Sequence, residues 1–463
     1  MITQVEIDGF KTFKDFKVEL APFQVIVGAN GSGKSNLFDA LQLLGRLAEL
    51  DLRSALQGLR GEPGELFAKI SDRDSANKIH ISVDMLLNPM IEDSLRRKAN
   101  VSERRLRYTV DIRQEKESDG LEVAFETLES IPLAEDSWLQ KHIPEKYSFS
   151  ASKEKKIFIS TSDSMEGAIV DLHQDGRGQK VSSPASSLDG TVLRGVVNTE
   201  YPHVFAVREE LRSLRFFHFN PLVLRQPSPT KAPQNLATDG AHLASVLARI
   251  QKEDKLALGD ISRDMANLVP GILRIHLERD RLGERFVIYA ETSDKRVFSS
   301  QVLSDGTLRL LALATLKNDL QFHGILCLEE PENGVSPPHL RNMAHLLRKM
   351  ATDLRDVSQL KEPLRQVLIT THSPLFISQP DVIDALLLAF MPTLVQSSTD
   401  PVHVTRMVPV MTHEALAHLE NISRDDKAIG AYATNTLADY LDGKLLAEAR
   451  ERLEKSHSEL NER

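Results

Sequence analysis

The segment from residue 28 to residue 35 constrains this chain more than any other part of its sequence. It consists of Gly-Ala-Asn-Gly-Ser-Gly-Lys-Ser and follows the apolar run 23–27 directly. Glycines let successive backbone N–H groups turn inward around phosphate oxygens, while the lysine reaches the terminal phosphates and the following serine ligates magnesium. A helix that begins near Gly33 adds its positive end. The pattern therefore predicts a strand, a phosphate loop and a helix that together bind a nucleoside triphosphate.

The loop assigns most of the predicted nucleotide ligands, with Ser35 also serving as a metal ligand. These ligands are Gly28, Asn30, Gly31, Gly33, Lys34, Ser35 and Asn36. The cofactors that this loop implies are ATP and Mg²⁺.

A second motif lies where the apolar run 324–328 ends in Glu329 and Glu330. A buried strand that ends in acids delivers carboxylates to the end of a parallel sheet. We expect Glu329 to hold the magnesium shell and Glu330 to orient or deprotonate the attacking water. The alternative is an acidic helix N-terminus that follows a core strand.

Two weaker motifs accompany this pair. Residues 303–307, Leu-Ser-Asp-Gly-Thr, open a helix, so the hydroxyl of Ser304 and the nearby N–H groups suit a further phosphate, although an ordinary N-cap would look the same. Residues 370–374 end another apolar strand and place His372 where a sheet delivers active-site residues. A lone histidine there is more often a satisfied loop residue.

The bulk composition limits the class of protein. The chain has 463 residues, 41% of them hydrophobic, and no uninterrupted apolar stretch approaches the roughly 20 residues that cross a bilayer. Residues 1–7 alternate like a strand, without the pattern of a secretion signal, so we expect a cytoplasmic protein with no membrane partner. The single cysteine, Cys327, excludes a disulfide framework and suggests a buried small hydrophobe. A net charge of -9 argues against nonspecific coating of nucleic acid.

Hydrophobic periodicity predicts how the chain is organised. We expect an ATPase N-lobe over 1–90, an inserted β and helical region over 91–284, an ATPase C-lobe over 285–414, and a helical tail over 415–463. The predicted helices lie at 37–47, 240–250, 260–268, 307–320 and 338–351. The predicted strands lie at 79–85, 106–112 and 121–125, which form an antiparallel layer, and at 285–290, 325–328 and 366–370. The polar stretch 130–200 is predicted to be an exposed insertion or linker.

Taken in order, the four motifs resemble a known group of ATPases. The phosphate loop, LSDGT, LCLEEPENG and ITTHSP, preceded by Ile-Asp-Gly-Phe-Lys-Thr-Phe at 7–13, resemble the ABC-type heads of the SMC, RecF and OLD group. The similarity is strongest to the short-armed AAA_15 and AAA_21 members and covers about residues 1–90 and 285–380. It implies an α/β P-loop NTPase head with a mixed sheet flanked by helices, an inserted antiparallel β-layer and a helical lobe. No heptad pattern persists, so long coiled-coil arms are not expected.

The resemblance also implies roles for individual residues. It implies a head-to-head homodimer in which ATP held by Lys34 and Ser35 of one subunit is closed over by Ser304 and Gly306 of the other. Glu330 is then the catalytic base for hydrolysis of ATP to ADP and phosphate, His372 the switch residue near the γ-phosphate, and Lys11 a phosphate contact. Asn333 and Gly334 would lie in the loop that contacts the second subunit.

The motifs depart from the usual pattern in two ways. Glu329 stands where most ABC heads carry Asp, and its extra methylene predicts slow hydrolysis. No glutamine loop can be placed, because no glutamine follows the first helix in an evident strand-end context.

Three functions remain open at this point. The first is a regulatory subunit for a separately encoded effector, such as a nuclease, in bacterial defence against phage or plasmids. An intrinsic nuclease is not expected, because the chain after His372 is too short for a Toprim domain and Asp425-Asp426 lacks strand-borne spacing. The third, a transporter subunit, is disfavoured by the long segment between the phosphate loop and LSDGT.

The second function is a RecF-like clamp that holds DNA. It rests on a basic segment formed by Arg96, Arg97, Lys98, Arg104, Arg105 and Arg107. The alternative is a solvated face, because Glu92, Asp93 and Glu103 are interleaved with these residues.

Overall fold

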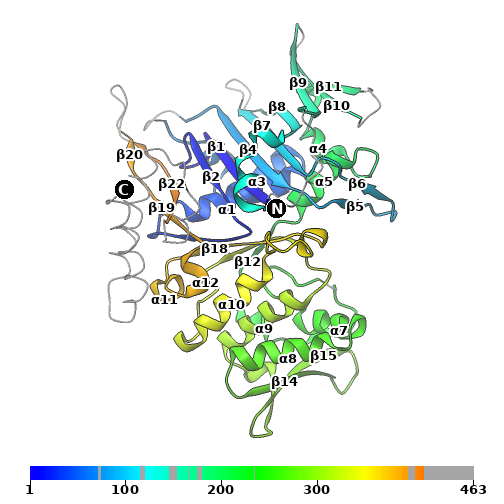
Figure 1. The fold of residues 1–463 in the computed structure, drawn as a ribbon, viewed down its shortest axis with the longest axis vertical. Coiled ribbons are helices and arrows are strands. Elements are labelled where there is room, and N and C mark those ends of the chain that lie inside the picture. The colour runs from blue at the N-terminus through cyan, green and yellow to red at the C-terminus, as the bar shows by residue number, and fades with distance from the viewer. Residues whose placement is uncertain are drawn as a thin grey trace.

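The computed structural model describes residues 1–70, 75–114, 120–144, 154–165, 167–174, 180–233, 235–394 and 402–410. Two sheets share the upper part of the molecule, and a mainly helical lobe lies below them (Figure 1). The predicted helical tail 415–463 lies outside the described residues. In the described part of the chain, no helix is both long and apolar enough to span a membrane.

The larger sheet has eight antiparallel strands in the order β11-β10-β9-β8-β7-β4-β1-β2. Its strands are β1 (Ile2–Asp8), β2 (Phe16–Glu19), β4 (Lys78–Leu86), β7 (Arg105–Gln114), β8 (Leu121–Ser130), β9 (Ile157–Ser164), β10 (Gly167–His173) and β11 (Lys180–Pro184). The predicted antiparallel layer is therefore confirmed. The domain boundaries remain a prediction, and this sheet runs across the first of them at residue 90.

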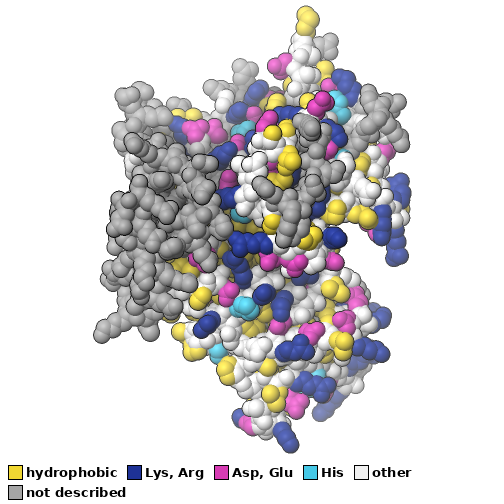
Figure 2. Space-filling view, viewed as in Figure 1, with side chains coloured by type: hydrophobic (Ala, Val, Ile, Leu, Met, Phe, Trp, Pro, Cys, Tyr) yellow, Lys and Arg dark blue, Asp and Glu magenta, His cyan; other side chains and the backbone are white. Residues whose placement is uncertain are grey.

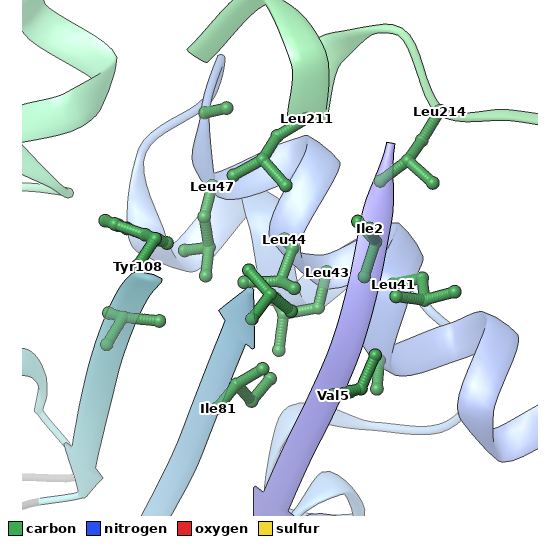
Figure 3. Close-up of a cluster of buried hydrophobic side chains, with 14 of the residues drawn as sticks. Ile2, Val5, Leu41, Leu43, Leu44, Leu47, Ile81, Tyr108, Leu211 and Leu214 are labelled. Carbon is green, nitrogen blue, oxygen red and sulfur yellow. The ribbon is translucent and has the colours of Figure 1, made fainter. Parts of the chain in front are cut away.

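One face of this sheet is apolar and packs against α1 (Lys34–Leu47), the helix that follows the phosphate loop. Figure 3 shows Leu41, Leu44 and Leu47 of α1 facing Val5 and Ile81 of the strands. Fully burying one such side chain contributes about 1.5–3 kcal/mol, so this contact anchors α1 firmly.

Residues 130–200 are predicted to be an exposed insertion or linker, and the linker alternative is wrong for the described residues. Three strands, β9 to β11, extend the sheet there, with Ile159 and Val170 buried against its core. Half of their other residues are Ser, Thr, Asp or Lys, and the outer strands expose much of their surface. Helices α3 (Ser137–His142), α4 (Val192–Gly195) and α5 (Pro202–Arg212) also fall in or beside this stretch.

The second sheet has six strands in the order β12-β17-β18-β3-β19-β22, and all of its pairs are parallel except β19 with β22. The strands are β3 (Phe23–Val27), β12 (Arg215–Phe217), β17 (Gly324–Glu329), β18 (Arg365–Thr371), β19 (Leu386–Phe390) and β22 (Arg406–Pro409). Both faces are buried: Ile325 and Cys327 join the α1 side, whereas Leu326 and Leu328 join the helical lobe. Cys327 is buried as predicted.

The helical lobe covers the other face of the six-stranded sheet. It contains α7 (Leu243–Glu253), α8 (Ala257–Leu268), α9 (Asp305–Asn318) and α10 (Leu340–Met350). A small sheet of β13 (Ser228–Pro229), β14 (Ile272–Arg279), β15 (Arg285–Thr292) and β16 (Val297–Ser299) packs on α7 and α8. These elements confirm the predicted helices near 240–268, 307–320 and 338–351, with boundaries shifted by a few residues.

Several short elements connect these layers. They are α2 (Leu52–Gln57), β5 (Met90–Glu92), β6 (Lys98–Asn100), α6 (Pro221–Leu224), α11 (Pro374–Ile377), α12 (Pro380–Ile383), β20 (Thr393–Leu394) and β21 (Val402–His403).

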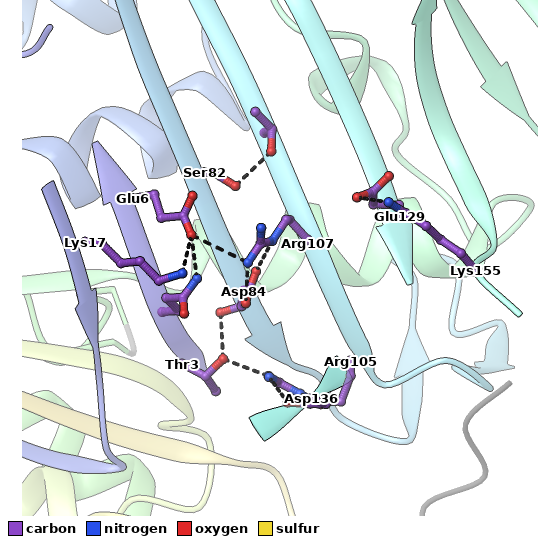
Figure 4. Close-up of polar contacts among 12 residues, drawn as sticks. Thr3, Glu6, Lys17, Ser82, Asp84, Arg105, Arg107, Glu129, Asp136 and Lys155 are labelled. Atoms are coloured by element: carbon purple, nitrogen blue, oxygen red, sulfur yellow. Dashed lines mark hydrogen bonds and ion pairs between the residues drawn. The ribbon is translucent and has the colours of Figure 1, made fainter. Parts of the chain in front are cut away.

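The predicted basic segment does not form one exposed surface. The guanidinium group of Arg105 is buried and donates to both carboxylate oxygens of Asp136, at 2.6 and 2.9 Å. Arg107 is paired in the same way with Asp84 (Figure 4). On the lower lobe in Figure 2, basic and acidic side chains are interspersed. Arg96, Arg97 and Lys98 lie in the β5–β6 hairpin, whereas Arg104 donates to the backbone carbonyls of Leu87 and Leu360.

Candidate active site

Three parallel strands deliver the predicted motifs to one edge of the six-stranded sheet. Glu329 at the end of β17 lies beside Thr370 of β18, and Thr371 lies beside Val27 of β3. The residues that follow are Glu330, His372 and Gly28. The phosphate loop, the paired acids and the histidine thus leave the sheet together, as the sequence predicted.

The phosphate loop turns sharply before α1 begins. Gly33 has φ +91°, a conformation that residues with a Cβ rarely adopt, and it is the N-cap of α1. Asn30 and Gly31 are exposed, whereas Gly28 is buried. The N-terminal end of α1 therefore lies beside the exposed part of the loop, where an anion can meet its N–H groups.

Lys34 is the first residue of α1 and lies against the loop. Its ammonium group donates to the carbonyl oxygens of Gly28 at 2.7 Å and Ala29 at 2.9 Å. Burial lowers the pKa of Lys34, and the nearby charges of Glu330 and Glu329 oppose that shift. The structure thus brings Lys34 and both predicted acids together.

Glu330 is held in a strained position. Its φ of +46° is unusual for a residue with a side chain, and such strain is found at functional sites. Its carboxylate contacts Nδ1 of His372 at 2.5 Å and accepts a hydrogen bond from the Asn333 amide at 2.8 Å. Its backbone N–H donates to the carbonyl of Thr370 at 2.8 Å. These contacts leave the carboxylate fixed at the sheet edge and partly open to solvent.

The donor set at this edge suits a magnesium ion. Ser35 supplies a hydroxyl from the first turn of α1, and the half-buried Glu329 supplies one carboxylate from the end of β17. Mg²⁺ is usually bound by one or two protein oxygens together with phosphates and several waters. The described residues contain no group of three or more His, Cys, Asp or Glu side chains placed to hold a metal by themselves. The residues present therefore fit Mg²⁺ that arrives with a nucleotide.

The signature turn around Ser304 lies in the other lobe. Ser304 is the exposed N-cap of α9 and accepts the N–H of Thr307, so the N-cap geometry predicted for it is confirmed. Gly306 packs so closely on the loop after β17 that a Cβ there would meet the carbonyl of Gly334 at 2.3 Å. Figure 1 shows α9 in the lower lobe and α1 in the upper part of the molecule. Within one chain the signature turn and the phosphate loop are separate.

Two predicted ligands make contacts within the protein. The ammonium of Lys11 donates to Asp39 of α1 at 2.6 Å and to the carbonyl of Arg60 at 3.0 Å. The amide of Asn36 donates to the hydroxyl of Thr12 at 2.8 Å. Their proposed contacts with a nucleotide remain predictions.

Several residues near this site were not predicted from the sequence. The hydroxyl of Thr405 is 2.7 Å from that of Thr12, which connects the segment before β22 to the turn between β1 and β2. The end of β12 lies beside β17, with Phe217 opposite Leu328, so His218 follows at the same sheet edge. No motif marks these residues; only the strand order reveals His218.

Two cavities adjoin the phosphate loop region. One, of about 270 Å³, is lined by residues 27–32 of the loop and 388–391 after β19. The other, of about 150 Å³, lies between residues 8–14, 68–70 and 402–404. The loop is therefore accessible from outside.

These features agree with a comparison of the whole chain with known families. The family AAA_21, described as "AAA domain, putative AbiEii toxin, Type IV TA system", matches residues 23–378. The chain belongs to this family. The matched range of the AAA_21 chain includes the phosphate loop, the signature turn, both acids and His372. No curated protein matches the chain.

Solved structures similar to this AAA_21 chain are heads of SMC proteins. The SmcHead bound to the C-winged helix domain of ScpA is 15% identical, with a TM-score of 0.46, over 89% of this chain and 99% of that one. The SMC head domain from Thermotoga maritima is 13% identical, with a TM-score of 0.39, over 89% and 99%. The Smc head domain bound to the C-terminal domain of ScpA, from Pyrococcus furiosus, is 14% identical, with a TM-score of 0.45, over 90% and 98%.

Proposed function

We propose that this AAA_21 chain hydrolyses ATP to ADP and phosphate with Mg²⁺, and that it does so as a head-to-head homodimer. The observation that carries the proposal is the position of Glu330, which is held by His372 and Asn333 at the sheet edge that also carries Lys34. Phosphoryl transfer needs positioning and charge neutralisation more than covalent chemistry, and this edge supplies both.

Each residue has a distinct task in this proposal. The turn before α1 cradles the phosphates with its N–H groups, and Lys34 moves from the loop carbonyls to the terminal phosphate. Glu330 accepts a proton from the attacking water, with His372 beside it to hold the carboxylate in place. Ser35 and Glu329 hold the metal, which neutralises phosphate charge when it is bound.

The dimer follows from the placement of the signature turn. Ser304 is exposed at the N-terminus of a helix of 14 residues, where the helix dipole favours an anion. Because α9 lies in the other lobe, the exposed Ser304 is available to a nucleotide held by a second copy of the chain, and the buried Gly306 lets the turn pack against Gly334. ATP would then be enclosed between two subunits.

The biological role that we propose is regulation of a separately encoded effector, such as a nuclease, in bacterial defence against phage or plasmids. The family description names a toxin–antitoxin system, in which two proteins act as a pair. The test is copurification of this chain with the product of a neighbouring gene, with and without ATP. A partner that is absent under both conditions would refute the role and leave the ATPase proposal intact.

A DNA clamp receives less support from the structure. Arg105 and Arg107 are committed to Asp136 and Asp84, so only part of the predicted basic segment can reach phosphates. The DNA clamp would regain support if DNA affinity fell steeply with salt concentration and if replacing Arg96 and Lys98 with alanine made that salt dependence shallower.

Light scattering together with ATP turnover tests the ATPase proposal. We expect Glu330→Gln to abolish turnover and to accumulate a dimer in ATP and Mg²⁺, whereas the wild type turns over and returns to a monomer. Glu362→Gln, an exposed glutamate at the opposite end of β18, is the matched control and should behave like the wild type. The proposal would be overturned if Glu330→Gln still hydrolysed ATP and if its molar mass from light scattering were the same with and without ATP.

A further inference from the structure

Glu332 is an acid close to the site that the proposed chemistry does not use. It lies in the loop after β17 and is only 6% exposed. One carboxylate oxygen accepts a hydrogen bond from the hydroxyl of Thr371. The other, Oε2, is buried and has no hydrogen-bond partner among the described residues. A buried glutamate in this state is costly, so its place calls for an explanation.

The contact with Thr371 fixes the turn that carries His372. The hydroxyl of Thr371, which is fully buried, also accepts the backbone N–H of Ser373 at 2.9 Å. His372 therefore stands between two residues that are anchored on either side of it. Ser373 in turn caps α11, with its hydroxyl accepting the N–H of Phe376 at 3.3 Å.

The loop after β17 carries both Glu330 and Glu332. Glu330 and Glu332 flank Pro331 on the β17 loop, and the Glu330 carboxylate contacts His372 on the β18 turn. The loop after β17 and the turn after β18 are thus joined by two contacts. Glu330 and His372 make the partly exposed contact, and Glu332 and Thr371 make the buried one. A shift in the buried contact would move the histidine relative to Glu330.

We propose that Glu332 is a positioning residue, which acts through Thr371 to hold His372 against Glu330. Its role is geometric, so an oxygen acceptor of the same size should replace it without a charge. Burial, the largest influence, raises the pKa of Glu332, and the nearby Glu330 acts in the same direction. A neutral carboxylic acid also explains how Oε2 tolerates burial without an ion partner.

The inference rests on the proposed ATPase function, but part of its test does not. The variants are Glu332→Gln, Glu332→Ala, Thr371→Ser and Thr371→Val, with Ser378→Ala as a control that removes a nearby hydroxyl outside this network. Four quantities are measured on the full chain: kcat for ATP, KM for ATP, the thermal midpoint, and the imidazole resonance of His372. The resonance is recorded in histidine-labelled protein and assigned with His372→Asn.

We expect Glu332→Gln and Thr371→Ser to keep kcat within about twofold and to keep the His372 resonance of the wild type. Glu332→Ala and Thr371→Val should lower kcat at least tenfold, change KM little, and move the resonance. Thr371→Val keeps the volume of the side chain, so it tests the hydroxyl even where Glu332→Ala fails to fold. Ser378→Ala should match the wild type throughout.

Two results would overturn the inference. If Glu332→Gln loses as much activity as Glu332→Ala, the charge of Glu332 acts directly. If Glu332→Ala and Thr371→Val lower only the thermal midpoint, with the resonance and kcat unchanged, Glu332 is merely structural. A wild type without ATP turnover refutes the proposed function instead, and the resonance still decides whether Glu332 positions His372.

Discussion

The side chain of Thr405 occupies the space where a Cβ on Gly33 would lie. Such a Cβ would be 1.9 Å from Oγ1 of Thr405, and the backbone N–H of Thr405 donates to the carbonyl of Thr12 at 2.9 Å. The residue before β22 thus packs directly on the turn that begins α1. The shape of the phosphate loop depends on the last described segment of the chain.

Gly33→Ala should therefore disrupt nucleotide binding. The positive φ costs an alanine about 1–2 kcal/mol, and the overlap with Thr405 adds about 1–3 kcal/mol unless the loop shifts. We expect ATP affinity to fall at least tenfold, as measured with a fluorescent ATP analogue. Adding Thr405→Gly should restore part of the loss by removing the overlap but not the strained φ. A Gly33→Ala variant that binds as well as the wild type would show that this packing does not shape the loop.

Arg105→Ala should destabilise the fold and should not act through nucleic acid. Arg105 is buried against Asp136 and donates to the hydroxyl of Thr3 at 2.7 Å. Removing one partner of a buried pair leaves an uncompensated charge, which costs about 3–5 kcal/mol. Urea unfolding measures this cost. The control, Arg113→Ala, removes an exposed arginine paired with Glu122 at 3.3 Å and should change stability by less than about 1 kcal/mol. Equal, small effects from both would contradict the prediction.

Stability should depend on the ionisation of Glu126. This residue is fully buried, accepts the backbone N–H groups of Val192 and Leu193, and receives the hydroxyl of Tyr108. Burial raises the pKa of Glu126 from its usual 4.5 to about 7, although the backbone hydrogen bonds oppose the shift.

Because the folded state binds the proton more tightly, the contribution of Glu126 is fully present below pH 4.5 and is lost as the pH rises through about 7. The total is on the order of 3 kcal/mol. Urea unfolding at pH 5 and pH 8 tests this. Relative to the wild type, the free energy of unfolding of Glu126→Gln should be higher at pH 8 than at pH 5. A constant difference between the two proteins would mean that Glu126 does not titrate in this range.

Arg225→Ala should weaken the proposed dimer without affecting ATP binding by one subunit. Arg225 pairs with Asp305 at 2.5 Å and donates to the carbonyl of Gln301 at 2.8 Å, so it braces the signature turn and balances a negative charge there. When Arg225→Ala is combined with Glu330→Gln, we expect the Kd of the ATP-induced dimer, measured by light scattering, to rise at least severalfold. Arg263→Ala, an exposed arginine on α8, is the control. Unchanged dimerisation would remove Arg225 from this role.

Much of the sheet edge was predictable because short motifs follow apolar strands. Three apolar runs, 23–27, 324–328 and 366–370, each predict a buried strand that ends at a site. The phosphate loop, the paired acids and His372 follow these runs, and the structure brings them together. The helical periodicity of 37–47 likewise predicted α1, because its apolar stripe faces the sheet.

The rest depended on contacts between distant segments, which a local pattern cannot show. In the strands between 157 and 184, apolar residues are mixed with Ser, Thr and Asp, and much of the surface is exposed, so the local pattern looks polar. The burial of Glu332 and of Arg105 depends on Thr371 and Asp136 from other segments. Composition alone marks all four as polar and gives no reason to place them inside.

The position of β3 has a consequence for how the protein is made. This strand is buried along its whole length between β18 and β19, yet it leaves the ribosome long before either of them. At synthesis rates of 5–20 residues per second, it waits roughly 20–70 s for its first partner. During that time its apolar side chains and the unpaired N–H and C=O groups of its backbone are exposed to other chains, so nascent-chain protection should govern the yield of folded protein. An incomplete chain, which lacks β18, can neither pair β3 nor assemble the residues that meet ATP.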